Sequence, residues 1–214
     1  MPSRTPATER LRDADRTRAE LLAVATQVFA EQGLSGARVD VIAERTRTTK
    51  RMIYYYFGSK QGLYLAVLED AYRGIRQAEQ EIHAPDLPPV DAVRRIAELT
   101  FDHHHAHPAF IRLVSIENIH HGQHLRQVES LRELGAPAAS LLDDVLSRGK
   151  ADGVFRTDVD AIDVHMLISS YCVFQVANNA TFGYLFDRDM TDPEIRDRNR
   201  TILGDVVVAW LTAR

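Results

Sequence analysis

Apolar residues recur at helical spacing from the first part of the chain. They fall at positions i, i+1, i+4, i+7 and i+8: Leu21, Leu22, Ala25, Val28 and Phe29. This is the pattern of an amphipathic helix with one buried face. Gly33 follows, and a glycine at that place ends a helix in the left-handed conformation. The pattern predicts a first helix over about 16–32.

Three further helices are predicted before residue 83. The second is barely two turns long and has its apolar positions at i, i+3, i+4 and i+7: Val39, Ile42, Ala43 and Thr46. Thr49 is placed to cap a third helix that ends near Phe57, and Ser59 to cap a fourth that runs to about Ile82. The first 82 residues therefore form four helices.

Prolines and glycines divide the rest of the chain into more helical stretches. Prolines 85, 88 and 89 precede a helix over 90–105, and Pro108 begins another that reaches about residue 121. Gly135 and Pro137 separate two helices, of which the second ends at Gly153. The last two cover about 160–186 and 191–212. No segment alternates like a strand, so the predicted fold class is all-α.

The last two helices have apolar residues on nearly every side. A helix without a polar face is buried on both sides. We expect a second copy of the chain to cover 160–186 and 191–212 across a two-fold interface. A wholly internal helix pair is the alternative.

Composition narrows the class of protein. The 214 residues are 45% hydrophobic and 26% charged, and the longest apolar run, residues 206–211, is far shorter than the ~20 residues of a membrane-spanning helix. No secretory signal is readable at the N-terminus, and Cys172 is the one cysteine. We expect a protein of the reducing cytoplasm.

The charge is divided unevenly along the chain. The net charge is −4, but residues 1–62 hold 11 Lys or Arg against 7 Asp or Glu, whereas the remainder holds 15 against 23. All nine histidines lie in that acidic remainder. The first third is therefore the candidate surface for nucleic acid.

The second and third helices have the spacing of a helix-turn-helix, whose second helix enters the major groove of DNA. A helix over 49–57 would turn Met52, Ile53, Tyr56 and Phe57 inward. Its other face holds Lys50, Arg51, Tyr54 and Tyr55, whose cations and hydroxyls suit phosphates and base edges. Thr48 and Thr49 in the turn and Lys60 at the start of the next helix complete this predicted surface. The alternative is that the fourth helix covers the tyrosines.

Residues 16–68 resemble the DNA-binding domain of the TetR family of bacterial transcriptional regulators. The resemblance is carried by Gly33, Val39, Ile42-Ala43, the run TKRMIYYYF at 49–57, Ser59-Lys60 and Leu63. It implies a homodimer, one helix-turn-helix per subunit, an all-α ligand domain, and a dimer interface made by the last two helices. The predicted division is a flexible arm over 1–15, a DNA-binding domain over 16–62, and a ligand-binding and dimerisation domain over 63–214.

Two positions depart from the family pattern. Arg38 stands where the family has Thr or Ser as a helix cap, which loses about 1 kcal/mol but places a cation beside DNA. Arg47 replaces a turn glycine, so it either adopts a positive φ or the turn differs locally. We include both in the predicted DNA surface. The arginines of the arm either enter a minor groove or form a solvated tail.

A histidine cluster offers the competing hypotheses. Glu117, His120, His121 and His124 would share one stripe if a helix continued through Gly122, and such a set suits a metal-dependent hydrolase or a metal sensor. The favoured alternative is a pocket for a small-molecule effector, with Glu117, Asn118, His121 and Asn178 as its polar groups. No hydrolase or nucleotide-binding motif is present. We therefore expect no cofactor and no enzymatic activity, but a ligand-responsive homodimeric repressor that binds a pseudo-palindromic operator.

Overall fold

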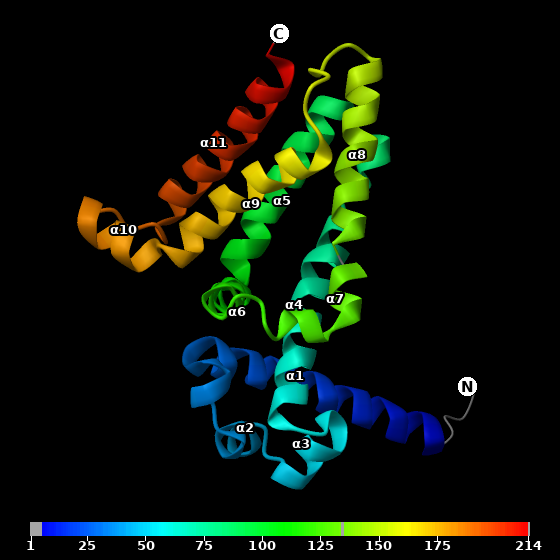
Figure 1. The fold of residues 1–214 in the computed structure, drawn as a ribbon, viewed down its shortest axis with the longest axis vertical. Helices are drawn as coiled ribbons and strands as arrows, with labels where there is room; N and C mark the ends of the chain where they lie inside the picture. Colours follow the sequence, from blue (N-terminus) through cyan, green and yellow to red (C-terminus); the bar gives the residue numbers. More distant parts are fainter. Residues whose placement is uncertain (1–5, 134, 214) are drawn as a thin grey trace. The chain divides into compact units, whose positions relative to one another are not determined.

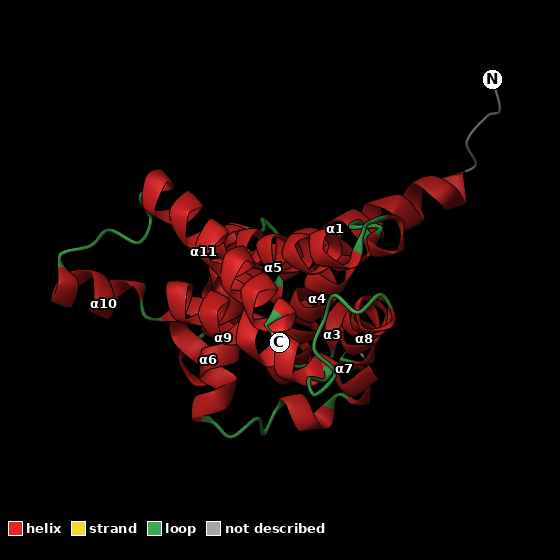
Figure 2. Ribbon diagram, turned by 90° about the horizontal axis from the view of Figure 1, so that it is seen from above, coloured by secondary structure: helices red, strands yellow, loops and turns green. Residues whose placement is uncertain are grey.

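The computed structural model describes residues 6–133 and 135–213. Figure 2 shows that these residues form helices and connecting loops without a strand, which confirms the predicted all-α class. None of the described helices is long and apolar enough to cross a bilayer.

The chain divides into two compact units, which do not follow the predicted boundary at 62/63. Unit 1 comprises Met1–Ala71 and Arg112–Val128, and unit 2 comprises Tyr72–Ile111 and Glu129–Arg214. Two helices, α4 (Lys60–Gln80) and α6 (Pro108–Ile119), have residues in both units. The predicted DNA-binding domain thus gains a second segment, distant in sequence, that hydrophobic periodicity does not reveal.

Unit 1 contains α1 (Pro6–Gly36), α2 (Val39–Arg45), α3 (Lys50–Phe57), parts of α4 and α6, and the short 3-10 helix η2 (Leu125–Gln127) (Figure 1). The helix α1 begins ten residues before the predicted start, so residues 6–15 of the predicted flexible arm are helical. Residues 1–5 lie outside the described part. Gly33 is non-helical, with φ 67° and ψ 177°, so it interrupts α1 where a C-terminal glycine was predicted.

The core of unit 1 is built from the apolar positions that define the predicted helices. Fully buried side chains come from α1, α2, α3 and α4: Leu21, Ala25, Phe29, Ile42, Ile53, Leu63, Tyr64 and Val67. Phe29 of α1 meets the ring of Tyr64 of α4 edge to face, with centroids 5.1 Å apart. This packing fixes α2 and α3 on a rigid base and leaves their outer faces to solvent.

Unit 2 contains the end of α4, the 3-10 helix η1 (Ala84–Asp86), α5 (Pro89–Ala106), the start of α6, α7 (Glu129–Glu133), α8 (Ala136–Ala151), α9 (Ala161–Ala177), α10 (Asn179–Phe186) and α11 (Pro193–Thr212). One apolar cluster joins α5, α8, α9 and α11. The segment 160–186, predicted as one helix, forms the two helices α9 and α10, because the backbone leaves the helical conformation at Asn178, with φ −102° and ψ 5°.

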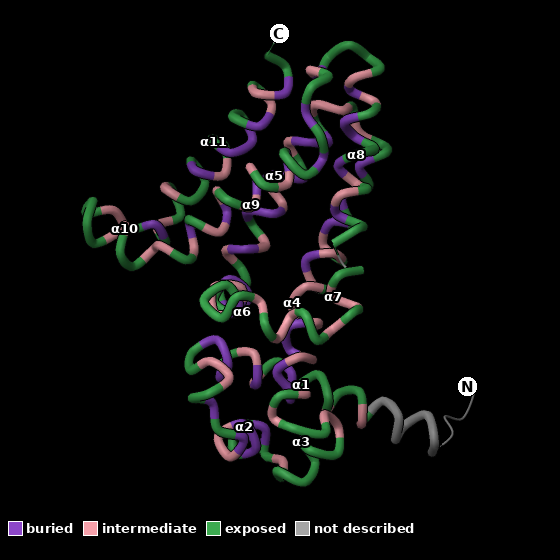
Figure 3. Tube along the Cα trace, viewed as in Figure 1, coloured by how far each residue is buried: buried purple, intermediate pink, exposed green. Residues whose placement is uncertain are grey.

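The helices α9 and α11 bury only one side each within the chain. Figure 3 shows buried and exposed positions alternating along both helices. Large apolar side chains remain exposed on α9, α10 and α11: Ile162, Met166, Phe174, Tyr184, Leu185, Phe186, Ile202 and Val206. The prediction of a wholly internal helix pair is wrong for a single chain, because these faces have no cover within the described residues.

Candidate DNA-binding surface

The turn between α2 and α3 is held by backbone and side-chain hydrogen bonds. Thr46 donates its hydroxyl to the carbonyl of Ile42 (2.8 Å), and the amide of Thr48 donates to the carbonyl of Ala43 (3.0 Å). Arg47 has φ 52°, so it adopts the left-handed conformation that the sequence left open. Its side chain is exposed at the turn.

The third helix begins at a capped residue, as predicted. The hydroxyl of Thr49 accepts from the amide of Met52 (3.3 Å), which satisfies one of the free N–H groups of the first turn. Arg38, at the start of α2, makes no such side-chain cap. The cap at Thr49 and the buried side chains of Ile42 and Ile53 therefore hold α2 and α3 in place.

The outer face of α3 is exposed. Tyr55 is 79% and Tyr54 44% accessible, so α4 does not cover them, and Lys50 and Arg51 are also exposed. Ile53 is fully buried. Met52 was expected inside but is 36% accessible, because it lies at the edge of the buried stripe. The structure thus brings the four predicted side chains onto one accessible face.

An acidic residue that the sequence analysis did not single out lies among these cations. Asp40 of α2 forms salt bridges with Lys50 of α3 and, at 3.7 Å, with Arg38. In the free protein the two cations therefore share one carboxylate. The sequence signal for this ion pair is Asp40 in the first turn of α2 together with Lys50 at the start of α3, since the two helices of a helix-turn-helix pack together.

Lys60 serves the structure of unit 1. Its ammonium donates to the carbonyl of Ser35 in α1 (3.3 Å), and its side chain is half-buried. Its contact with a phosphate stays a prediction, and the free protein uses this cation to join α4 to α1.

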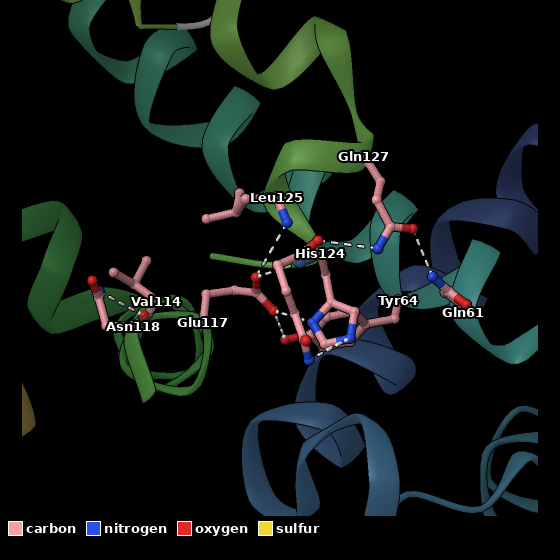
Figure 4. A network of polar contacts seen from close by, with 9 residues as sticks. Gln61, Tyr64, Val114, Glu117, Asn118, His124, Leu125 and Gln127 are labelled. Carbon is pink, nitrogen blue, oxygen red and sulfur yellow. Dashed lines mark hydrogen bonds and ion pairs between the residues drawn. The ribbon is translucent and has the colours of Figure 1, made fainter. Parts of the chain in front are cut away.

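Glu117 lies in a hydrogen-bond network of unit 1 (Figure 4). Its buried carboxylate accepts from the hydroxyl of Tyr64 (2.8 Å), Nδ1 of His124 (2.9 Å), and the amides of Leu125 (3.2 Å) and His124 (3.3 Å). Burial acts to raise the pKa of Glu117, but hydrogen bonds from Tyr64, Leu125 and His124 outweigh it and lower that pKa. Burial and the bond to Glu117 raise the pKa of Tyr64. Four donors leave little room for an effector at this carboxylate.

The other predicted effector residues do not join Glu117. Asn118 is exposed and donates to the carbonyl of Val114 (2.9 Å), His121 is exposed, and Asn178 ends α9 in unit 2. Within unit 1, Glu117, Asn118 and His121 do not form a common pocket, because Asn118 and His121 are exposed whereas the carboxylate of Glu117 is buried. Asn178 belongs to unit 2, and its part in an effector site stays a prediction.

The histidine stripe is not formed either. The helix α6 ends at Ile119, and His121 (φ 56°) and Gly122 (φ 66°) turn the backbone through left-handed conformations. Within 6–133 and 135–213, no three His, Cys, Asp or Glu residues are placed to hold a metal ion. The metal-dependent hydrolase or sensor therefore has no support in the structure.

Comparison with known proteins identifies the family to which this helix-turn-helix belongs. Residues 21–67 match the family described as bacterial regulatory proteins, tetR family, and residues 89–207 match the tetracyclin repressor-like C-terminal domain. The HTH-type transcriptional repressor NicS of Pseudomonas putida is 33% identical over 202 residues, which cover 94% of this chain and 95% of that protein. The HTH-type transcriptional repressor SCO4008 of Streptomyces coelicolor is 30% identical over 73% of this chain and 77% of that protein.

Solved structures have the same fold. SCO4942 from Streptomyces coelicolor superposes with a TM-score of 0.70 at 29% identity and covers 91% of this chain and 98% of that one. A tetR-family regulatory protein from Rhodococcus RHA1 gives a TM-score of 0.72 at 16% identity, covering 92% and 98%. The chain therefore belongs to the TetR family and is a helix-turn-helix DNA-binding transcriptional regulator.

Proposed function

We propose that the protein is a cytoplasmic, homodimeric repressor that binds a pseudo-palindromic operator and releases it when a small-molecule effector binds. The observation that carries the proposal is the exposed face of α3, where two cations and two tyrosines stand on a rigid apolar base. Such a face suits phosphate contact and base readout in the major groove. Repression is favoured because the two relatives matched over most of this chain are named repressors.

The contact residues divide by their chemistry. Arg51 and Lys50 reach base edges or phosphates, Tyr54 and Tyr55 donate hydroxyls, and Thr48 and Thr49 lie at the start of the helix that enters the groove. Arg38 at the start of α2 and Arg47 in the turn before α3 neutralise phosphates. Because Asp40 holds Arg38 and Lys50 in the free protein, binding exchanges one shared carboxylate for phosphate oxygens.

Dimerisation is proposed through α9 and α11. The exposed apolar side chains of these helices would be covered by the same faces of a second copy, as a two-fold interface requires. In both Figures 1 and 2 α10 lies at the rim of unit 2, beyond the ends of α9 and α11, so its apolar side chains would extend the same interface. One helix-turn-helix per subunit then reads one half-site.

Effector binding would act through the spacing of the two recognition helices. The helices α4 and α6 have residues in both units, so a change in unit 2 that tilts α4 would alter that spacing. The effector must bind the state that cannot engage DNA more tightly, since equal affinity for both states would shift nothing. No metal or other cofactor is part of this proposal.

Selection from a pool of random DNA duplexes tests the function. The purified full-length protein should enrich an inverted repeat whose half-site centres lie about one helical turn, ~34 Å, or a multiple of it apart. A Lys50→Ala, Arg51→Ala double variant should enrich nothing. Enrichment of no motif by the wild-type protein, or of the same motif by the variant, would contradict the proposal.

A further inference from the structure

Several charged and titratable side chains of unit 2 are buried or partly buried between its helices. Arg76 and Glu79 come from α4, His103 and His104 from α5, and His165 from α9. The side chains of Arg76 and Glu79 are only 12% and 8% exposed, and His104 is 6% exposed. Buried ionised groups are costly unless they are paired and hydrogen-bonded. A polar interior of this kind therefore needs an explanation.

The guanidinium of Arg76 lacks hydrogen-bond acceptors. Nη1 of Arg76 lies 2.9 Å from Oε2 of Glu79 as an ion pair, but neither Nη1 nor Nε, both buried, has a hydrogen-bond partner among the described residues. Nδ1 of His103 is also buried and unpartnered. A guanidinium has five N–H donors and accepts nothing. Glu79 is the carboxylate paired with Arg76, so the guanidinium of Arg76 retains donor capacity that an additional anion would satisfy.

Burial dominates the electrostatics of these groups. It lowers the pKa of His103 and of His104 to about 4, and it lowers the pKa of His165. The histidines are consequently neutral near pH 7, and Arg76 supplies the positive charge. Burial also lowers the pKa of Arg76 and raises that of Glu79, because neither group recovers its full hydration through the pair.

A small cavity is lined by two members of the cluster, Glu79 and His165, whereas Arg76, His103 and His104 lie outside its wall. Glu79, Thr100 and His165 contribute polar groups to its wall, and Ile96, Leu142 and Ile168 contribute apolar ones. Its volume is about 10 Å³, which accommodates about one water molecule. The ring of Phe110 lies against both His103 and His104, with centroids 6.3 and 5.7 Å away. An occupant larger than water must move the surrounding helices apart.

We propose that this cluster is the effector site and that it selects small carboxylates with an apolar or aromatic body, with Arg76 as the group that binds the acid. A carboxylate accepts from a guanidinium through charge-assisted hydrogen bonds. The apolar walls and Phe110 receive the rest of the molecule. The proposal rests on the proposed ligand-responsive repressor and gives its effector a chemical class.

The position of the cluster gives binding a consequence. Arg76 and Glu79 lie one turn apart on α4, and the first residues of the same helix belong to the DNA-binding unit. A ligand that takes hydrogen bonds of Arg76 and widens the cavity acts directly on α4. The ligand therefore favours a conformation that the unliganded protein does not adopt.

Matched probes test the class of ligand. Binding of 4-fluorobenzoate and 4-fluorobenzamide to the full-length protein is followed by ¹⁹F NMR at constant ionic strength, with butyrate and hexanoate as competitors. The fluorobenzoate should bind at least tenfold more tightly than the uncharged amide, and hexanoate should displace it. Equal affinity for the two probes, or binding of neither up to 20 mM, would overturn the proposal.

Variants locate the site. Arg76→Gln should weaken fluorobenzoate binding at least tenfold, and Arg76→Lys, which keeps a charge but not the planar fork, should lie between it and the wild type. The control is Arg95→Gln, at an exposed arginine of α5, which should bind as the wild type does. Circular dichroism establishes that each variant is folded. Unchanged affinity in folded Arg76→Gln would contradict the assignment.

Selective DNA binding is measured in the same preparation. Intact operator binding together with failure of every carboxylate would refute this ligand class and leave the repressor standing. Carboxylate binding without sequence-selective DNA binding would refute the repressor and leave the site standing.

Discussion

The Glu117 network makes a sharp prediction about the stability of unit 1. Glu117→Ala removes a carboxylate that accepts four hydrogen bonds and leaves the fully buried hydroxyl of Tyr64 without an acceptor. An unsatisfied buried polar group costs about 1–3 kcal/mol, and the half-buried ring of His124 loses a second, charge-assisted bond. We expect a destabilisation of about 2–4 kcal/mol.

A double-mutant cycle separates the hydrogen bond from the packing. Tyr64→Phe keeps the ring against Phe29 and removes the donor, so this variant alone should lose about 1 kcal/mol. In the Tyr64→Phe, Glu117→Ala double variant no hydroxyl is stranded. The double variant should therefore be more stable than the sum of the single losses by about 1–2 kcal/mol.

Urea unfolding at one fixed protein concentration measures these differences, because the apparent stability of a dimer depends on its concentration. The exposed Asn118→Ala variant, one residue along α6, is the matched control and should change the unfolding midpoint little. Additive losses within about 0.5 kcal/mol, or a Glu117→Ala variant as stable as the wild type, would refute the account of the network.

The remaining predictions concern DNA, the dimer and acid. Arg51→Ala should cost about 1–3 kcal/mol in operator binding without altering sedimentation, and unchanged affinity would refute its contact. Asp40→Asn frees Arg38 and Lys50, so binding to any duplex should strengthen in low salt; weaker binding would contradict this competition. Met166→Asp should yield monomers in sedimentation, whereas an intact dimer would exclude that face of α9. Folding lowers the pKa of Glu117, so the stability that its carboxylate contributes should be complete above the ordinary pKa of 4.5 and be lost as the pH falls through the folded-state pKa. The urea midpoint of Glu117→Gln should therefore depend less on acid than that of the wild type. Equal dependence on acid in the two proteins would contradict this.

The helix-turn-helix could be predicted because its frame is local. Leu21, Phe29, Ile42 and Ile53 lie at helical spacing, Thr49 caps a helix, and each of these signals acts within a few residues. The exposed face of α3 follows directly from the buried one. DNA binding could be predicted for the same reason, since the side chains expected to contact DNA occupy the positions of α3 that do not pack into the core.

The proposed effector site could not be predicted from the sequence, because it depends on tertiary context. His121 and Gly122 adopt left-handed conformations that end the histidine stripe, and a spacing of i, i+3, i+4 and i+7 means nothing without a continuous helix. Arg76 and His165 lie 89 positions apart, on α4 and α9, and no periodicity reveals that these two helices line one cavity. The sequence pointed to Glu117 as a ligand group, whereas the structure places its carboxylate in a network within unit 1.

Fluorescence anisotropy against the DNA upstream of the gene, and against the motif enriched by selection, tests the central claim most directly. The wild-type protein should bind a specific duplex tightly, at two subunits or a multiple per site, and its affinity should fall steeply with salt because cations of the α3 face displace counterions. A scrambled duplex should bind at least a thousandfold more weakly. Equal affinity for the specific and scrambled duplexes would contradict the claim that this face of α3 reads DNA sequence.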